Sequence, residues 1–160
     1  MQLSSSLSPN FTFGQAVHSD VASHDGIDNV SSAQDSSIQA NMAFAAQNLE
    51  HVRMLLNNEL TITSWYRSAE LNAKVGGVGS SAHTTGYAVD FVSPNAGSPY
   101  QICTLLERYL HSLFIDQLIL DTNSSGARWV HVAFAPSSIA RYETLTKVQN
   151  GYMAGIILSV

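Results

Sequence analysis

The sequence predicts an α+β fold in which a small antiparallel sheet packs against helices. Residues 36–58 repeat apolar side chains at three- and four-residue spacing, which indicates one buried face of a long amphipathic helix. Short runs of β-branched and apolar residues, several of them alternating with polar ones, indicate strands at 60–65, 87–92, 117–121 and 129–134.

Length and composition favour one compact domain over residues 1–160. Charged residues are only 12% of the chain, which excludes disorder driven by charge excess. The net charge is −5, and Lys and Arg do not cluster, so nucleic acid is not expected as a main partner. The single cysteine, Cys103, excludes an internal disulfide framework and a zinc site built from cysteines.

The two ends of the chain give weaker signals. Residues 1–35 are rich in Ser, Asp and Gly, and we expect a wrapping arm with short turns, anchored by Phe11, Phe13 and Val17. The N-terminus lacks the basic and apolar regions of a signal peptide. The apolar tail at 151–160 is shorter than the roughly 20 residues of a membrane span. It is expected to form a last core strand or a contact through which the protein forms oligomers.

Three further segments have recognisable ends. Ser68 is expected to cap a helix at 68–75 with Gly76 after it, and the glycines of the loop 76–81 allow close backbone approach to a ligand. Ser98 and Pro99 begin a second helix that is expected to run to about His111. Residues 137–150 read as weakly helical.

Candidate metal ligands occur at three positions. His83 and Asp90 lie 90 − 83 = 7 positions apart, where a loop enters a strand. On the strand 129–134, side chains alternate, so His131 lies on the face opposite its aliphatic neighbours. A catalytic zinc ion takes three such ligands and keeps a fourth position open. The alternative is that His131 is a hydrogen-bonded core histidine and that 83–90 is a simple turn.

The motifs resemble a known family. These are SxHxxGxAxD at 81–90, WVHVxF at 129–134, TITSWYRSAELNAKVGG at 61–77, DQLILD at 116–121, LEHVRMLL at 49–56 and the segment 11–29. Together they resemble the zinc D-alanyl-D-alanine carboxypeptidase and L-alanyl-D-glutamate endopeptidase family, in its compact phage and bacterial branch, which shares a fold with the hedgehog signalling domain. The resemblance implies one zinc ion held by His83, Asp90 and His131, with Arg67 and Ser81 contacting substrate.

The general base is where this sequence departs from the family pattern. Many relatives carry an acid three residues before the last histidine, but here Arg128 stands there, and a guanidinium cannot accept a proton. The branch that this chain resembles places an acid at the end of the DQLI strand instead, which implies Asp121. Asp116 is the second candidate for the base, and Asp121 has the alternative role of capping the following turn.

The function implied by the resemblance is a zinc metallopeptidase that cleaves peptidoglycan stem peptides, as carboxypeptidase or endopeptidase. We expect a phage-type lytic or cell-wall processing enzyme, made in the cytoplasm and acting on the wall after release. The alternative is a non-catalytic zinc-binding domain of the same fold with a virion-structural or wall-binding role. A metal-free carbohydrate-binding module would require the three ligands to lie far apart.

Overall fold

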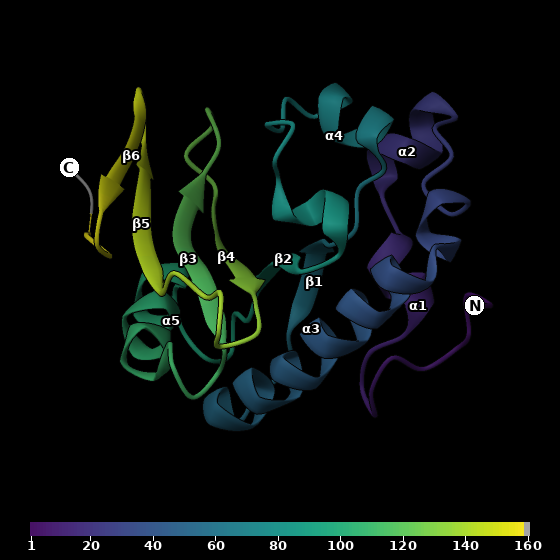
Figure 1. The fold of residues 1–160 in the computed structure, drawn as a ribbon. Coiled ribbons are helices and arrows are strands. Elements are labelled where there is room, and N and C mark those ends of the chain that lie inside the picture. Colours follow the sequence, from purple (N-terminus) through teal and green to yellow (C-terminus); the bar gives the residue numbers. More distant parts are fainter. Residues whose placement is uncertain (159–160) are drawn as a thin grey trace. The chain divides into compact units, whose positions relative to one another are not determined.

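The computed structural model describes residues 1–158, so the last two residues of the predicted apolar tail, 159–160, lie outside it. The chain divides into two compact units. The first comprises residues 1–50 and 64–89, and the second comprises residues 51–63 and the described residues from 90 onward. The predicted class is confirmed, since helices accompany a six-stranded sheet (Figure 1). Within the described residues, no helix is long and apolar enough to cross a membrane.

The N-terminal 35 residues contain short helices where a wrapping arm with short turns was expected. They form α1 (Phe13–Val17), α2 (Asp20–Asp25) and the 3-10 helix η1 (Ser32–Gln34). Thr12 and Gln15 form a capping box at the start of α1, and Ser19 caps α2 through the backbone N–H of Ala22. The three apolar anchors expected in this segment are buried.

The remaining helices of the first unit agree closely with the sequence. The long helix α3 (Ser36–Leu56) occupies the predicted range, and its first part, to residue 50, belongs to this unit. The predicted cap Ser68 accepts the backbone N–H of Leu71 at the start of α4 (Ala69–Lys74). The 3-10 helix η2 (Ala82–Thr85) follows the glycine-rich loop and carries the first candidate ligand.

Trp65 is the centre of the core in the first unit. Its ring is fully buried and meets Phe11 edge to face at 6.1 Å, and its indole N–H donates to the carbonyl of Gly86. Gly86 has φ +85°, and a Cβ there would lie 2.9 Å from the side chain of Met42 on α3. A glycine is therefore required where η2 turns back against the helix.

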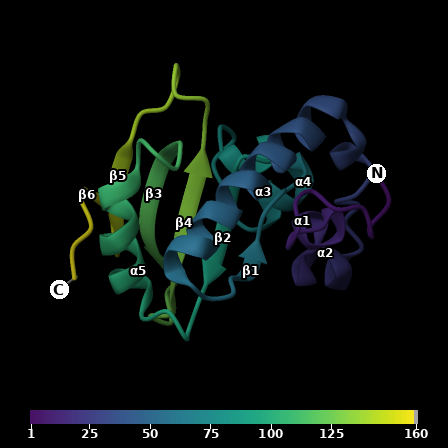
Figure 2. The same ribbon diagram turned by 90° about the horizontal axis from the view of Figure 1, so that it is seen from below.

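The second unit is built on the sheet, whose strand order is β1-β2-β4-β3-β5-β6. The strands are β1 (Thr61–Ser64), β2 (Ala88–Val92), β3 (Ile115–Thr122), β4 (Arg128–Phe134), β5 (Glu143–Val148) and β6 (Gly151–Ala154). Figures 1 and 2 show β4, β3, β5 and β6 side by side. All four strands predicted from the sequence are present, to within two residues at their ends.

The two central strands separate an apolar face from a polar one. Strands β3 and β4 are antiparallel, with Ile119 opposite His131 and Asp121 opposite Trp129. The alternate positions carry the apolar side chains Leu118, Leu120, Val130 and Val132, all of which are buried. Helix α5 (Pro99–Leu106), which begins with the predicted cap Ser98, packs against both strands, and the 3-10 helix η3 (Glu107–Tyr109) extends it. The side chain of His131 therefore lies on the face opposite the aliphatic one, as predicted.

The C-terminal part differs from the prediction. Residues 143–148 form strand β5 rather than a weak helix, and β5 pairs with β3 in parallel, so the sheet is not entirely antiparallel. The alternation in ETLTKV suits a half-buried strand better than a helix. The predicted last strand does form as β6, but it is exposed along its whole length and is not part of the core.

We predict that Asn29→Ala lowers the free energy of unfolding by about 3 kcal/mol. The buried Asn29 side chain donates to the carbonyls of Val17 and Tyr66 and accepts the backbone N–H of Ser68, so alanine leaves three backbone groups unpaired. Urea denaturation measures the change. The exposed Asn95→Ala is the control, and equal stabilities of the two variants would contradict the prediction.

Candidate metal centre

His83 is held in η2 by a local network of hydrogen bonds. Ser81 caps this short helix, because its hydroxyl accepts the backbone N–H of His83 at 3.4 Å and its carbonyl accepts the hydroxyl of Thr84 at 2.7 Å. Gly86 ends the helix in the left-handed conformation. The sequence SAHTTG therefore fixes the backbone on both sides of the histidine.

The imidazole of His83 is buried and oriented by a backbone carbonyl. Its Nδ1 lies 2.6 Å from the carbonyl oxygen of Trp65, and its residue exposure is 2%. A carbonyl oxygen can only accept a hydrogen bond, so Nδ1 carries the proton. In the neutral form with this tautomer, the ring presents its lone pair at Nε2, which is the arrangement typical of a metal-binding histidine.

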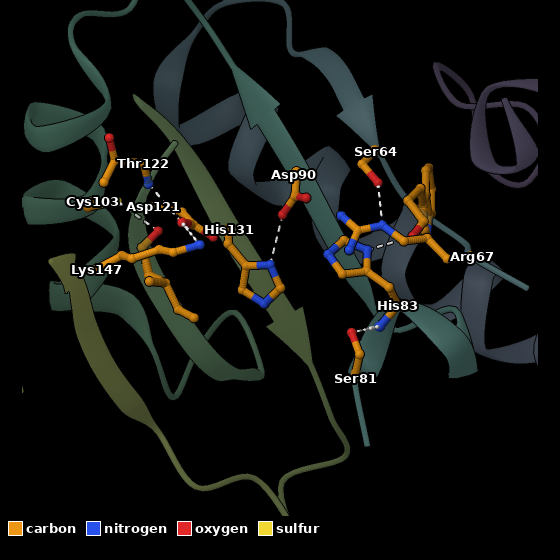
Figure 3. Close-up of polar contacts among 12 residues, drawn as sticks. Ser64, Arg67, Ser81, His83, Asp90, Cys103, Asp121, Thr122, His131 and Lys147 are labelled. Atoms are coloured by element: carbon orange, nitrogen blue, oxygen red, sulfur yellow. Dashed lines mark hydrogen bonds and ion pairs between the residues drawn. The ribbon is translucent and has the colours of Figure 1, made fainter. Parts of the chain in front are cut away.

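Asp90 and His131 come from β2 and β4 in the second unit. Their exposures are 5% and 8%, and the Nδ1 of His131 lies 2.7 Å from Oδ1 of Asp90 (Figure 3). A carboxylate that is buried in this way needs a proton donor or a cation beside it. Here the imidazole N–H supplies the donor.

The structure brings the three predicted ligands together. Each of His83, Asp90 and His131 offers one donor atom, and these atoms lie within 4.8 Å of one another. In a tetrahedral zinc site, bonds of about 2.0–2.1 Å place the donors about 3.4 Å apart, a spacing that this limit includes. Two imidazoles and one carboxylate are also a donor set that suits zinc. The residues present therefore fit a zinc ion.

Arg67 lies on the segment between β1 and α4. Its Nε donates to the hydroxyl of Ser64 at 2.9 Å, and its backbone N–H donates to the carbonyl of His83 at 3.1 Å. The first bond orients the guanidinium, and the second joins this segment to η2. Arg67 and Ser81, both predicted to contact substrate, are thus connected to the helix that carries a candidate ligand.

Asp121 lies on the same face of the sheet as His131. It is a diagonal neighbour of that histidine, since Asp121 is opposite Trp129 and His131 is two residues further along β4. Such neighbours lie about 7–8 Å apart. The carboxylate accepts the backbone N–H of Thr122 at 2.7 Å and pairs with Lys147 at 3.2 Å.

Asp116, the second candidate for the general base, is engaged by Arg141. The guanidinium contacts both carboxylate oxygens, at 2.5–3.1 Å, and the backbone N–H of Arg141 donates to Oδ1 at 2.7 Å. Burial alone raises the pKa of Asp116, but the hydrogen bonds and the charge of Arg141 outweigh burial and hold this pKa below its usual value. These contacts give Asp116 a structural function, which is to fix the connection before β5.

Arg128 occupies the position where many relatives carry an acid. It is opposite Thr122, and because side chains alternate along β4, it lies on the face of the sheet opposite Trp129 and His131. With Lys147 and residues of the β3–β4 turn, Arg128 lines a cavity of about 490 Å³ at this end of the sheet.

Lys147 and Arg141 were not predicted from the sequence, because both lie in the segment predicted to be helical. The alternation in residues 143–148 is the signal that could have identified β5.

The donor cluster defines a candidate metal centre in a protein of mixed helices and strands. A family model described as Peptidase M15 matches residues 10–133, which is most of the chain. The chain belongs to the peptidase M15 family, whose members are zinc peptidases and include the D-alanyl-D-alanine carboxypeptidases. The comparison with curated proteins returned no match.

We predict that Arg141→Met lowers the free energy of unfolding by about 1 kcal/mol at pH 7. Because the pKa of Asp116 is lowered in the folded state, its ion pair stabilises the fold fully above the unfolded pKa of about 3.9. That contribution is lost as the pH falls through the lowered pKa. Urea denaturation at pH 7 and pH 3 should show a smaller difference at pH 3. The exposed Arg108→Met is the control, and an equal difference at both pH values would contradict the prediction.

Proposed function

We propose that this protein is a zinc metallopeptidase that hydrolyses peptide bonds in peptidoglycan stem peptides. The observation that carries the proposal is the cluster of His83, Asp90 and His131 donor atoms in a chain of the peptidase M15 family. In this proposal His83 binds one zinc ion through Nε2, and Asp90 and His131 complete the protein ligands. The bound ion supplies Lewis-acid activation of a water molecule and of the substrate carbonyl.

The number of donors favours an enzyme over the alternative, a zinc-binding domain without catalysis. Among the described residues, the cluster has three His, Cys, Asp or Glu donors. Structural zinc sites are usually closed by four protein ligands, whereas catalytic sites use three and keep one position open. A site of three donors therefore supports hydrolysis.

Asp121 is the proposed general base. Its carboxylate takes a proton from the attacking water as the oxygen adds to the peptide carbonyl carbon. It returns the proton to the amine nitrogen as the C–N bond breaks. Asp121 shares a face with His131, and a diagonal separation of about 7–8 Å leaves room for a water molecule between the two side chains.

Arg67 and Ser81 are the proposed substrate contacts. A guanidinium presents several N–H donors in a planar fork, which suits a substrate carboxylate or the negative charge that develops on the carbonyl oxygen. The hydrogen bond from Nε to Ser64 limits the rotation of Arg67. Ser81 would offer its hydroxyl to the substrate while continuing to cap η2.

The family and the resemblance of the motifs support the proposed substrate class, and the proposal includes both carboxypeptidase and endopeptidase activity. Mass spectrometry of products from defined stem peptides distinguishes release of a terminal D-alanine from cleavage after L-alanine. A phage-type lytic or wall-processing role, with action on the cell wall after release, is part of the same proposal.

We predict that the wild-type protein binds one zinc ion and releases new amino groups from peptidoglycan. His83→Ala should weaken zinc binding and hydrolysis by more than about 100-fold, since losing a ligand exceeds the effect of losing a supporting hydrogen bond. Competition with a chromogenic chelator measures zinc affinity. The exposed His51→Ala is the matched control. Hydrolysis that continues after complete removal of metal would overturn the mechanism.

We predict that Asp121→Asn lowers kcat by about 10²–10⁴-fold while zinc content stays unchanged, because an amide cannot accept the proton. Asp116→Asn is the comparison and should keep kcat near the wild-type value, since the carboxylate of Asp116 is bound by Arg141. The opposite result, with activity lost in Asp116→Asn and kept in Asp121→Asn, would assign the base to Asp116.

A further inference from the structure

The C-terminal hairpin of β5 and β6 lies outside the residues that match the family. The match covers residues 10–133, whereas β5 begins at Glu143 and β6 ends at Ala154. Nonetheless β5 joins the sheet directly beside β3, with Ile119 level with Leu145 and Leu120 level with Thr146. The hairpin therefore adds side chains to the face that carries His131.

Lys147 is the residue of this hairpin that reaches the proposed base. It lies one position beyond the Leu120–Thr146 pair, so it is level with Asp121 and on the same face. Its Nζ lies 3.2 Å from Oδ1 of Asp121 (Figure 3). The Asp121 side chain is 13% exposed and that of Lys147 is 38% exposed, so the contact is only partly open to solvent.

Both contacts of the Asp121 carboxylate involve the same oxygen. Lys147 and the backbone N–H of Thr122 each contact Oδ1, at 3.2 Å and 2.7 Å. Within residues 1–158, no hydrogen bond to Oδ2 is formed. Two donors on Oδ1 fix the plane of the carboxylate, and Oδ2 remains as the oxygen that can accept a proton.

The groups around Lys147 favour this geometry. Tyr152 on β6 is opposite Lys147, and its ring centroid lies 5.9 Å from the ammonium. Glu143, the acid on this face of β5, accepts a hydrogen bond from Gln117 and contacts Arg141. Asp121 is therefore the carboxylate with which Lys147 forms its ion pair.

We propose that Lys147 is a positioning residue for the general base, supplied by the C-terminal hairpin from outside the family-matched region. It holds Oδ1 of Asp121 so that Oδ2 faces the water that loses its proton. This inference rests on the proposed function, because it gives Lys147 a part in the same reaction. A lysine that only stabilised the fold would act independently of Asp121.

The test compares Lys147→Met and Lys147→Arg in the full chain loaded with zinc. Lys147→Met should lower kcat by about 10- to 100-fold, with KM and zinc content unchanged, and Lys147→Arg should restore most of the activity. In the Asp121→Asn background, Lys147→Met should cause no further loss, since the residue acts through Asp121. Lys74→Met is the matched control, because Lys74 forms an ion pair with Asp25 in the first unit.

A second measurement does not depend on activity. In protein labelled with ¹³C at the aspartate carboxyl groups, the Asp121 resonance is the one that disappears in Asp121→Asn. Lys147→Met should shift this resonance, whereas Lys74→Met should shift the resonance of Asp25 instead.

The outcomes separate the two proposals. If zinc-loaded wild-type protein hydrolyses no stem peptide, the proposed function is overturned, and this role of Lys147 with it. If wild-type protein is active and Lys147→Met keeps its kcat or leaves the Asp121 resonance in place, only the positioning role is overturned. The positioning role would also be overturned if Lys147→Met lowered kcat as much in the Asp121→Asn background as it does in the wild-type protein.

Discussion

The pairing of β3 with β4 is the constraint on which the chemistry of the second unit depends. A shift of one residue would move every side chain of a strand to the other face of the sheet. In the observed register, Leu118, Leu120, Val130 and Val132 share one face of the two strands, and His131 and Asp121 share the opposite face. The hydrophobic core therefore fixes the register, and the register places the polar groups.

Burial of the donor groups imposes a second constraint. Burying a carboxylate or an imidazole without a hydrogen-bond partner costs free energy, so each buried group needs a partner nearby. His83 meets the carbonyl of Trp65, and Asp90 meets the ring of His131. The Trp65 ring is fixed in turn by its bond to Gly86, which follows η2. The same short segment thus carries a candidate ligand and supports Trp65, whose carbonyl orients that ligand.

Much of this arrangement could be predicted from the sequence, because its signals are local. Helix α3, the caps at Ser68 and Ser98 and the strands around the candidate ligands follow from periodicity and capping residues. The cluster itself was predicted from the motifs. Strand β5 was missed because its alternating residues, 143–148, were interpreted as weakly helical. Its parallel pairing with β3 joins residues distant in sequence, and no local pattern encodes that pairing. The contacts of Asp121 and Asp116 depend on that strand, so they were beyond prediction too.

The exposure of β6 indicates where local unfolding of the sheet begins. Local unfolding is easiest where few apolar contacts are buried, and β6 is exposed along its whole length at the edge of the sheet. Fraying that begins there reaches β5 before it reaches β3 and β4. Amide hydrogen exchange should therefore be fastest in the hairpin and slowest in the central strands. His131 on β4 would therefore keep its surroundings during local unfolding that separates Lys147 from Asp121.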